Sequence, residues 1–242
     1  DIYNNLGTVF LELKKYDNAL KNYDEAIKIK PDYAEVYFNR GNTFKELNRL
    51  EEAVDSYNQA IKIMPNYIEA YNNLGNLFKN LGKLEEAVAN FEKARNLNPN
   101  FAEAHFNHGT ALIELGEITS AIKSFNEALS FRPDYAQAHN NLGNAYKQSG
   151  NLSAAIKSYE KAISNKDNYA EAQNNLGLAF MNLGILDSAA VHLKIALKIK
   201  PNYIFANNNY GSLLSQLGKF TESINYYQNA LSVDPNFFEA HS

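Results

Sequence analysis

The sequence contains no cysteine and no tryptophan. Without cysteine there are no disulfides, zinc–thiolate sites or cysteine nucleophiles, and we expect a reducing, cytoplasmic location. No apolar run approaches the roughly 18 residues that a membrane span needs, and the first residues of the sequence do not read as a signal peptide. Basic residues do not outnumber acidic ones, because the net charge is −4. We therefore expect neither a membrane nor a nucleic acid among the partners.

Glycine and proline are scarce, and they are periodic rather than scattered. All 12 glycines and all 6 prolines fall in register with a repeat of roughly 34 residues. The chain is 45% hydrophobic, which is enough to bury a core. The sequence therefore predicts a stack of repeats around a continuous core instead of one or two globular domains.

We number the repeat positions so that the glycine present in every copy is position 8. These glycines are Gly7, Gly41, Gly75, Gly109, Gly143, Gly177 and Gly211. Small residues recur at positions 20 and 27, aromatic residues predominate at 11 and 24, and proline stands at 32 except for Asp167 in the fifth copy. Glycine opposite alanine allows two helices to approach closely, and the aromatic side chains fill the flanking space.

Each copy contains the signals of two helices. Position 33 is always Asp or Asn, and Glu or Gln usually follows three residues later, which predicts an N-cap with a capping box. Glycine or Asn48 at position 15 suits a left-handed helix end. We predict a first helix over about positions 1–14 and a second over about positions 17–31.

The whole pattern strongly resembles the tetratricopeptide repeat (TPR), a helix-turn-helix unit of the same length. The resemblance implies an all-α fold, a right-handed superhelical solenoid of about seven antiparallel units in a single domain over residues 1–242. The repeats span approximately 1–33, 34–67, 68–101, 102–135, 136–169, 170–203 and 204–237, and an eighth starts at 238. Because no polar cap covers the last repeat, we expect a piece of a longer protein.

One arc of the first helix is left for a partner. At about 100° per residue, positions 4, 7, 8 and 11 form the apolar arc, and positions 2, 5, 6, 9, 12 and 13 form the opposite one. By resemblance to TPR solenoids, this second arc lines a concave groove that binds partners.

Asparagine occupies position 6 in every copy and recurs at position 9, while lysine recurs at position 12. The candidate peptide-binding residues are Asn5, Asn39, Asn73, Asn107, Asn141, Asn175 and Asn209 at position 6, Asn42, Asn76 and Asn144 at position 9, and Lys45, Lys79 and Lys147 at position 12. Asparagine is a mediocre helix former, and its amide matches a peptide unit in having a donor and an acceptor. We hypothesise that these amides form a ladder along the groove, which holds the extended backbone of a bound peptide. Compositional bias, or hydrogen bonds between repeats that serve packing alone, are the open alternatives.

The run Asn-Leu-Gly-Asn-x-x-Lys, found from Asn73 to Lys79 and from Asn141 to Lys147, looks most like the repeats of O-linked N-acetylglucosamine transferases. In that family an asparagine ladder on the inner face holds peptide substrates. We therefore consider a non-catalytic protein–protein interaction scaffold that binds extended peptides, the substrate-recruiting arm of a larger glycosyltransferase, and a scaffold that self-assembles through its terminal repeats. Positions 2, 5 and 6 are never basic, so a two-carboxylate clamp for chaperone C-terminal peptides is not expected.

No catalytic residue, cofactor or metal is expected in this chain. Every glycine belongs to the repeat, which leaves none for a phosphate loop or a nucleophile elbow. His105, His139 and His241 stand at position 4, where other copies have tyrosine, and are predicted core residues. His105 and His108 lack a carboxylate on the same arc that would complete a metal site.

The fifth repeat departs from the pattern at its end. Asn165 stands at position 30, which is aliphatic or aromatic elsewhere, and Asp167 replaces the proline. The loss of a buried side chain weakens a joint between repeats, and so does the loss of a proline. Residues 163–169 are therefore predicted to be the weakest junction between repeats.

Overall fold

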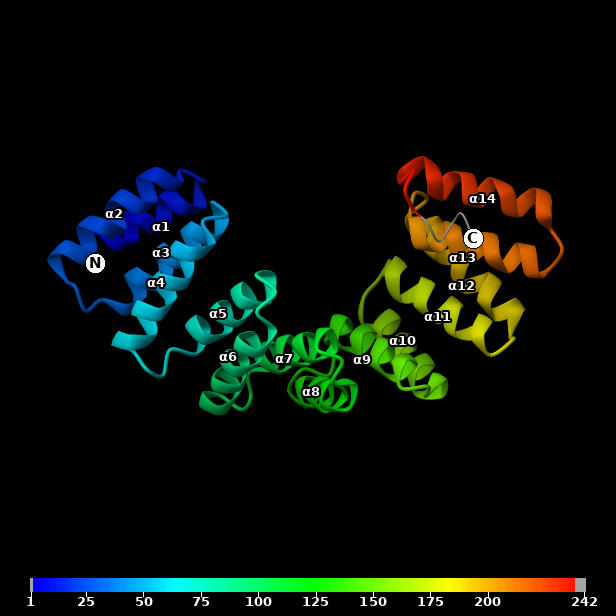
Figure 1. The fold of residues 1–242 in the computed structure, drawn as a ribbon, viewed down its shortest axis with the longest axis horizontal. Coiled ribbons are helices and arrows are strands. Elements are labelled where there is room, and N and C mark those ends of the chain that lie inside the picture. Colours follow the sequence, from blue (N-terminus) through cyan, green and yellow to red (C-terminus); the bar gives the residue numbers. More distant parts are fainter. Residues whose placement is uncertain (1, 238–242) are drawn as a thin grey trace. The chain divides into compact units, whose positions relative to one another are not determined.

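The computed structural model describes residues 2–237, and these residues form fourteen α-helices and no β-strand (Figure 1). The helices are α1 (Ile2–Glu12), α2 (Tyr16–Ile29), α3 (Ala34–Glu46), α4 (Leu50–Ile63), α5 (Ile68–Asn80), α6 (Leu84–Leu97), α7 (Ala102–Glu114), α8 (Ile118–Phe131), α9 (Ala136–Gln148), α10 (Leu152–Asn165), α11 (Ala170–Asn182), α12 (Leu186–Ile199), α13 (Ile204–Gln216) and α14 (Phe220–Val233). They follow one another as helix-turn-helix pairs, in which the odd-numbered helix comes first. The prediction of an all-α array of about seven such units is confirmed.

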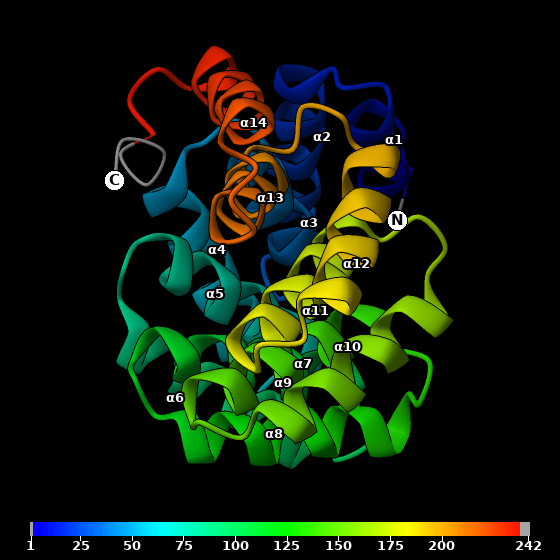
Figure 2. The ribbon, with the colours of Figure 1, turned by 90° about the vertical axis from the view of Figure 1, so that its right-hand side faces the viewer.

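The chain folds as two compact units, Asp1–Glu117 (unit 1) and Ile118–Ser242 (unit 2), which we describe separately. Unit 1 contains α1 to α7, and unit 2 contains α8 to α14. Within each unit every helix packs against the next one along the chain, as α13 and α14 do in Figure 2. First helices of neighbouring repeats also touch, for example α5 with α7 and α11 with α13. No helix within residues 2–237 is long and apolar enough to cross a membrane.

The glycine at position 8 faces the aromatic ring at position 24 of the partner helix. A Cβ atom added to Gly143 would lie 2.5 Å from Cε1 of Tyr159, and one added to Gly75 would lie 2.7 Å from Cε1 of Phe91. Both rings are completely buried. The prediction that this glycine permits close helix packing is confirmed, but the group that requires it is the ring rather than the alanines at positions 20 and 27.

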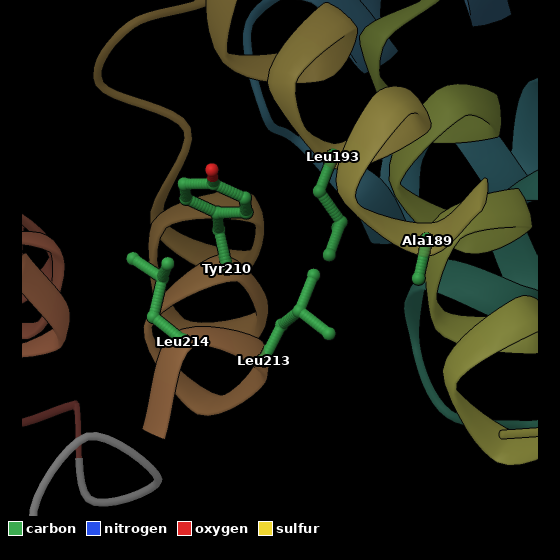
Figure 3. Packing of buried hydrophobic residues seen from close by; sticks show 5 residues of the cluster. All are labelled: Ala189, Leu193, Tyr210, Leu213 and Leu214. Carbon is green, nitrogen blue, oxygen red and sulfur yellow. The ribbon is translucent and has the colours of Figure 1, made fainter. Parts of the chain in front are cut away.

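A hydrophobic cluster in unit 2 shows how one helix pair is joined to the next. Ala189 and Leu193 of α12 form one cluster with Tyr210, Leu213 and Leu214 of α13, and Leu213 points toward Leu193 while Leu214 points away from α12 (Figure 3). All five side chains are buried. Burying a leucine of this kind contributes about 1.5–3 kcal/mol, so apolar packing supplies most of the attraction at this joint.

The predicted N-cap is wrong, whereas the predicted C-terminal signal is confirmed. The first helices begin after the aromatic residue at position 34, for example Tyr33 and Tyr67, and these residues make no side-chain capping bond. The ring of Tyr33 packs against the core of α2 and α3, so tertiary packing decides where the helix begins. Position 15 is left-handed as expected, with φ of 71° at Gly82 and 56° at Asn48.

Position 30 is not the buried position that the sequence predicts. Ile29 is 71% exposed and Leu97 is 40% exposed, because the last turn of the second helix extends past the core. Asn165 therefore removes no core side chain, and any weakness of the fifth joint must come from another cause.

The histidines at position 4 partly match the core prediction. His105 is buried, with Nε2 2.8 Å from the carbonyl oxygen of Pro99. His139 is only half-buried, and its Nε2 lies 2.8 Å from the carbonyl oxygen of Pro133. His241 lies outside the described residues. Each of these two histidines therefore holds the turn that precedes its own helix.

Candidate functional site

The candidate residues lie on the first helices, at the boundary between core and solvent. Asn5 is exposed. The others, which are Asn39, Asn73, Asn107, Asn141, Asn175, Asn209, Asn42, Asn76, Asn144, Lys45, Lys79 and Lys147, are half-buried. Positions 6, 9 and 12 are spaced by three residues and so lie along one side of each helix. We call these residues of a unit its ladder face.

Amides at position 6 form hydrogen bonds to the preceding repeat. Nδ2 of Asn39 donates to Oδ1 of Asn4 at 3.0 Å, and Nδ2 of Asn107 donates to Oδ1 of Asn72 at the same distance. The same bond joins Asn175 to Asn140 at 3.1 Å and Asn209 to Asn174 at 2.9 Å. The acceptor in each case stands at position 5, so these amides form hydrogen bonds from repeat to repeat.

Position 5 lies on the accessible arc of an isolated helix but is buried in the structure. Asn4, Asn72, Asn140 and Asn174 are at most 4% exposed. Nδ2 of Asn140 donates to Oε1 of Glu171 at 2.8 Å, and Nδ2 of Asn72 donates to Oε1 of Glu103 at 3.3 Å. The glutamate of the predicted capping box therefore accepts from the preceding repeat, and the placement of position 5 on the accessible arc is wrong because the next repeat covers it.

In the second repeat, where position 5 is a phenylalanine, position 9 is the acceptor instead. Repeat 2 carries Phe38, and there Nδ2 of Asn73 donates to Oδ1 of Asn42 at 2.9 Å. The hydroxyl of Tyr57 donates to the same oxygen at 2.7 Å. Burial raises the pKa of the Tyr57 phenol, so the hydroxyl keeps its proton at neutral pH.

Unit 2 repeats this arrangement at Asn144. The hydroxyl of Tyr159 donates to Oδ1 of Asn144 at 2.8 Å, and Nδ2 of Asn175 approaches the same oxygen at 3.3 Å. Burial also raises the pKa of the Tyr159 phenol. In both units, therefore, a buried tyrosine and a position-6 amide orient the amide at position 9.

In several of these amides the bonds leave one half for a ligand, whereas in Asn175 both halves are used, because its Oδ1 accepts from Nδ2 of Asn174 at 3.4 Å. Within the described residues, Oδ1 of Asn39, Asn73 and Asn107 accepts no hydrogen bond, and Nδ2 of Asn42 and Asn144 donates none. Position 6 thus offers an acceptor and position 9 a donor. A peptide backbone alternates the complementary groups, so the ladder face can bind both.

The three lysines differ in their surroundings. Nζ of Lys79 lies 3.6 Å from Oε1 of Glu114. For Lys45 and Lys147, no carboxylate in the described part of the chain comes within ion-pair distance. Burial lowers the pKa of Lys147, since the ammonium is removed from water. Repeat spacing predicted the three lysines but not which of them has a partner.

Metal-binding groups do not converge on the ladder face. The described residues contain no cluster of three His, Asp or Glu side chains that could hold a metal ion. The groups that this face offers a partner are the amides and ammonium groups described above.

The buried histidine of α7 lies beside an arginine. His108 Nδ1 is 3.4 Å from Nη1 of Arg95, and burial lowers the pKa of His108 to about 4.

Comparisons with known proteins identify the repeat. The family description "TPR repeat" matches residues 7–48, 41–82, 109–150 and 143–184, and the description "Tetratricopeptide repeat" matches residues 68–101 and 206–237. No curated protein sequence matches the chain.

Solved structures share the fold. A crystal structure of MamA is 29% identical, with a TM-score of 0.64, and the match covers 66% of this chain and 94% of that one. YrrB, described as a TPR protein with an unusual peptide-binding site, is 21% identical with a TM-score of 0.62, covering 78% and 97%. PilF of Pseudomonas aeruginosa is 16% identical with a TM-score of 0.75, covering 89% and 96%. Because the family descriptions match more than half of its residues, the chain belongs to the tetratricopeptide repeat family.

Proposed function

We propose that the chain is a non-catalytic scaffold that binds an extended segment of another protein along its ladder face. The observation that carries this proposal is the division of the amides. In Asn39, Asn73 and Asn107, Nδ2 joins the repeats, and Oδ1 remains available at the same side of successive helices. A row of like amides matches an extended polypeptide, because only a backbone repeats the same donor and acceptor along its length.

The proposal implies broad recognition with no dominant residue. Amide-to-backbone bonds do not read side chains, and each contributes about 0.5–1.5 kcal/mol net. The bonds between repeats hold the amides in place before the ligand arrives, which lowers the entropic cost of binding. The peptide-binding site that is described for YrrB is a precedent within the same fold.

The test must separate binding from packing, because position-6 amides do both. Asn107→Ala removes the bond to Asn72 and the acceptor on the ladder face. Asn72→Ala removes the same bond but lies in the core, so it leaves the face intact. The probe is a twelve-residue peptide selected on the protein from a random display library, and binding is measured by fluorescence anisotropy alongside the melting temperature.

Both variants should lower the melting temperature. Asn107→Ala should weaken binding by about 2- to 10-fold, and Asn72→Ala should weaken it less, because it loosens the Asn107 amide without removing the acceptor. Asn209→Ala with Asn174→Ala forms the matched pair in unit 2, since Nδ2 of Asn209 donates to Oδ1 of buried Asn174. Equal loss of binding in both members of a pair would identify the ladder as a packing device and contradict the proposal.

A second candidate is the substrate-recruiting arm of a larger glycosyltransferase. The two Asn-Leu-Gly-Asn-x-x-Lys runs, Asn73–Lys79 and Asn141–Lys147, favour it. It uses the same peptide-binding face, so the peptide experiment does not distinguish the two. The sequence of the full gene distinguishes them. A glycosyltransferase domain in the same reading frame supports the second candidate, and the absence of such a domain rules the second candidate out.

A further inference from the structure

We propose that Lys147 is the point at which the ladder face of unit 2 binds the carboxylate of an acidic side chain and so fixes the register of the bound peptide. The inference rests on the proposed peptide-binding function and adds to it a preferred ligand, an acidic extended peptide. It comes from a comparison of Lys147 with the equivalent lysine of unit 1, which has an acid of its own.

The pair in unit 1 shows where a lysine at position 12 reaches. Lys79 belongs to α5, and Nζ approaches Oε1 of Glu114 in α7, the first helix of the next repeat, to 3.6 Å. Glu114 stands at position 13 of that repeat. The residue at the same position after Lys147 is Asn182 of α11, an exposed amide without charge. The location that holds a carboxylate in unit 1 therefore lacks one in unit 2.

Lys147 also bears a solvation cost that no internal group offsets. Its side chain is half-buried, and burial lowers its pKa. No carboxylate in the described residues forms an ion pair with it. A charged group that is partly removed from water is stabilised by an opposite charge at short range, and charge-assisted bonds are stronger than neutral ones. A ligand carboxylate can supply the partner that Glu114 supplies to Lys79.

The ladder face of the next first helix, α11, limits which side chain of the ligand can lie beside it. Positions 9 and 12 of α11 are Leu178 and Met181, both half-buried, in place of the amide and lysine found in other repeats. Packed helices lie roughly 8–10 Å apart, and an extended chain rises about 3.3 Å per residue. The preferred ligand therefore carries an apolar side chain about three residues from its acidic one.

Lys45 provides an intermediate case. It also faces an amide, Asn80, at position 13 of the next repeat. The neighbouring positions 9 and 12 are Asn76 and Lys79, so a second cation and a polar amide surround the ligand there. This polar surrounding does not select an apolar neighbour, and Lys45 should contribute less to register.

The experiment uses the full chain and a random dodecapeptide display library. Peptides are selected on the wild type and on Lys147→Met, and one acidic binder is then synthesised as a Glu and Gln pair. The wild type should bind the Glu peptide about tenfold more tightly than the Gln peptide at low salt, and the difference should shrink as salt rises. Lys147→Met should bind both equally, while the control Lys157→Met, which changes an exposed lysine of α10 outside the ladder face, should keep the preference.

The outcomes are distinct. Loss of the preference in Lys147→Met, with unchanged circular dichroism, supports the assignment. Equal binding of the Glu and Gln peptides by the wild type, or a preference that survives in Lys147→Met, overturns the assignment and leaves the peptide-binding function standing. A library that yields no binder on the wild type overturns both.

Discussion

The α12–α13 joint and the α10–α11 joint belong to the same unit but differ in how the connecting turn is held. At the first, Nδ2 of buried Asn207 donates to the carbonyl oxygen of Pro201 at 2.8 Å. At the second, Asp167 replaces the proline, and Gln173 takes the place of Asn207. Oε1 of Gln173 instead lies 2.8 Å from Nδ1 of His192, within the body of the repeat. The α10–α11 turn therefore lacks the side-chain hydrogen bond that holds the α12–α13 turn.

Two further features accompany this difference. Asn168 adopts a left-handed conformation with φ of 55°, which asparagine tolerates better than most residues. A hollow of about 370 Å³ lies beside the turn and is lined by Asn168, Gln173, Ile195, Lys198 and Ile199. The turn between the fifth and sixth repeats therefore lacks both the proline at position 32 and a side chain at position 4 that hydrogen-bonds to it.

The largest effect that we expect concerns acid at the α6–α7 joint. His108 is buried. Its burial chiefly, and then the charges of Arg95 and His105, lower its pKa to about 4, and Oε1 of Glu92 lies 3.8 Å from its Nε2. An imidazole in the unfolded chain titrates near 6.5, so between about pH 6.5 and 4 the unfolded state binds more protons than the folded state. The free energy of unfolding should fall as the pH falls through this window, by up to about 3 kcal/mol.

The control for this prediction is His108→Leu, since Leu142 and Leu176 occupy the same position in unit 2. Hydrogen exchange of α6 and α7 at pH 7, 5.5 and 4.5 measures the effect. Exchange of these helices in the wild type should accelerate at low pH beyond its intrinsic pH dependence, and the variant should lose this acceleration. An unchanged pH response in His108→Leu would contradict the role of His108.

The second effect tests the fastening of the α12–α13 turn directly. Asn207→Leu leaves the carbonyl of Pro201 without its donor and also removes the 3.1 Å bond to the oxygen of Tyr203. We expect a loss of about 1–3 kcal/mol in the free energy of unfolding, measured by urea denaturation. Asn207→His should retain most of the stability, because His139 makes the equivalent contact with Pro133. If both variants lose the same amount, the hydrogen bond is not what holds this turn.

The smallest effect is a repair of the α10–α11 joint. In the wild type, amides of residues 163–169 should exchange faster than those of the other joints. Asp167→Pro combined with Gln173→His should slow their exchange and stabilise the chain by about 0.4–1 kcal/mol, since the proline restricts the unfolded chain. Equal exchange at all joints of the wild type would show that the missing fastening has no consequence.

Much of the fold can be predicted from the sequence because its signals act within one helix pair. Glycine at positions 8 and 15 and the apolar period predicted the pairs and the helix ends, and Gly82 and Gly143 behave as these signals indicate. The N-cap prediction is wrong because it treats Asp32 by local propensity alone. The neighbouring Tyr33 packs into the joint, and the helix begins after it.

The candidate site was less accessible to sequence reasoning, because it depends on contacts between repeats. Asn72 and Asn73 are adjacent and chemically identical, yet Asn72 is buried against Glu103 while Asn73 stays half-exposed. A helical wheel places both on one arc, since it contains no neighbouring repeat. The same limit explains why the ion pair of Lys79 with Glu114 was not expected. That the position-6 asparagines bind a peptide remains a prediction.

The use of either of two acceptors by the position-6 amides bears on how copies of a repeat can diverge. Phe38 has no amide to offer, yet Asn73 is still held, because Asn42 accepts instead, and Asn175 reaches an acceptor at both positions. Either acceptor can therefore drift to another residue type while the other remains, but the donor is shared by both solutions and has no substitute. A duplicated repeat can vary at positions 5 and 9 from its first generation, whereas position 6 must be inherited unchanged.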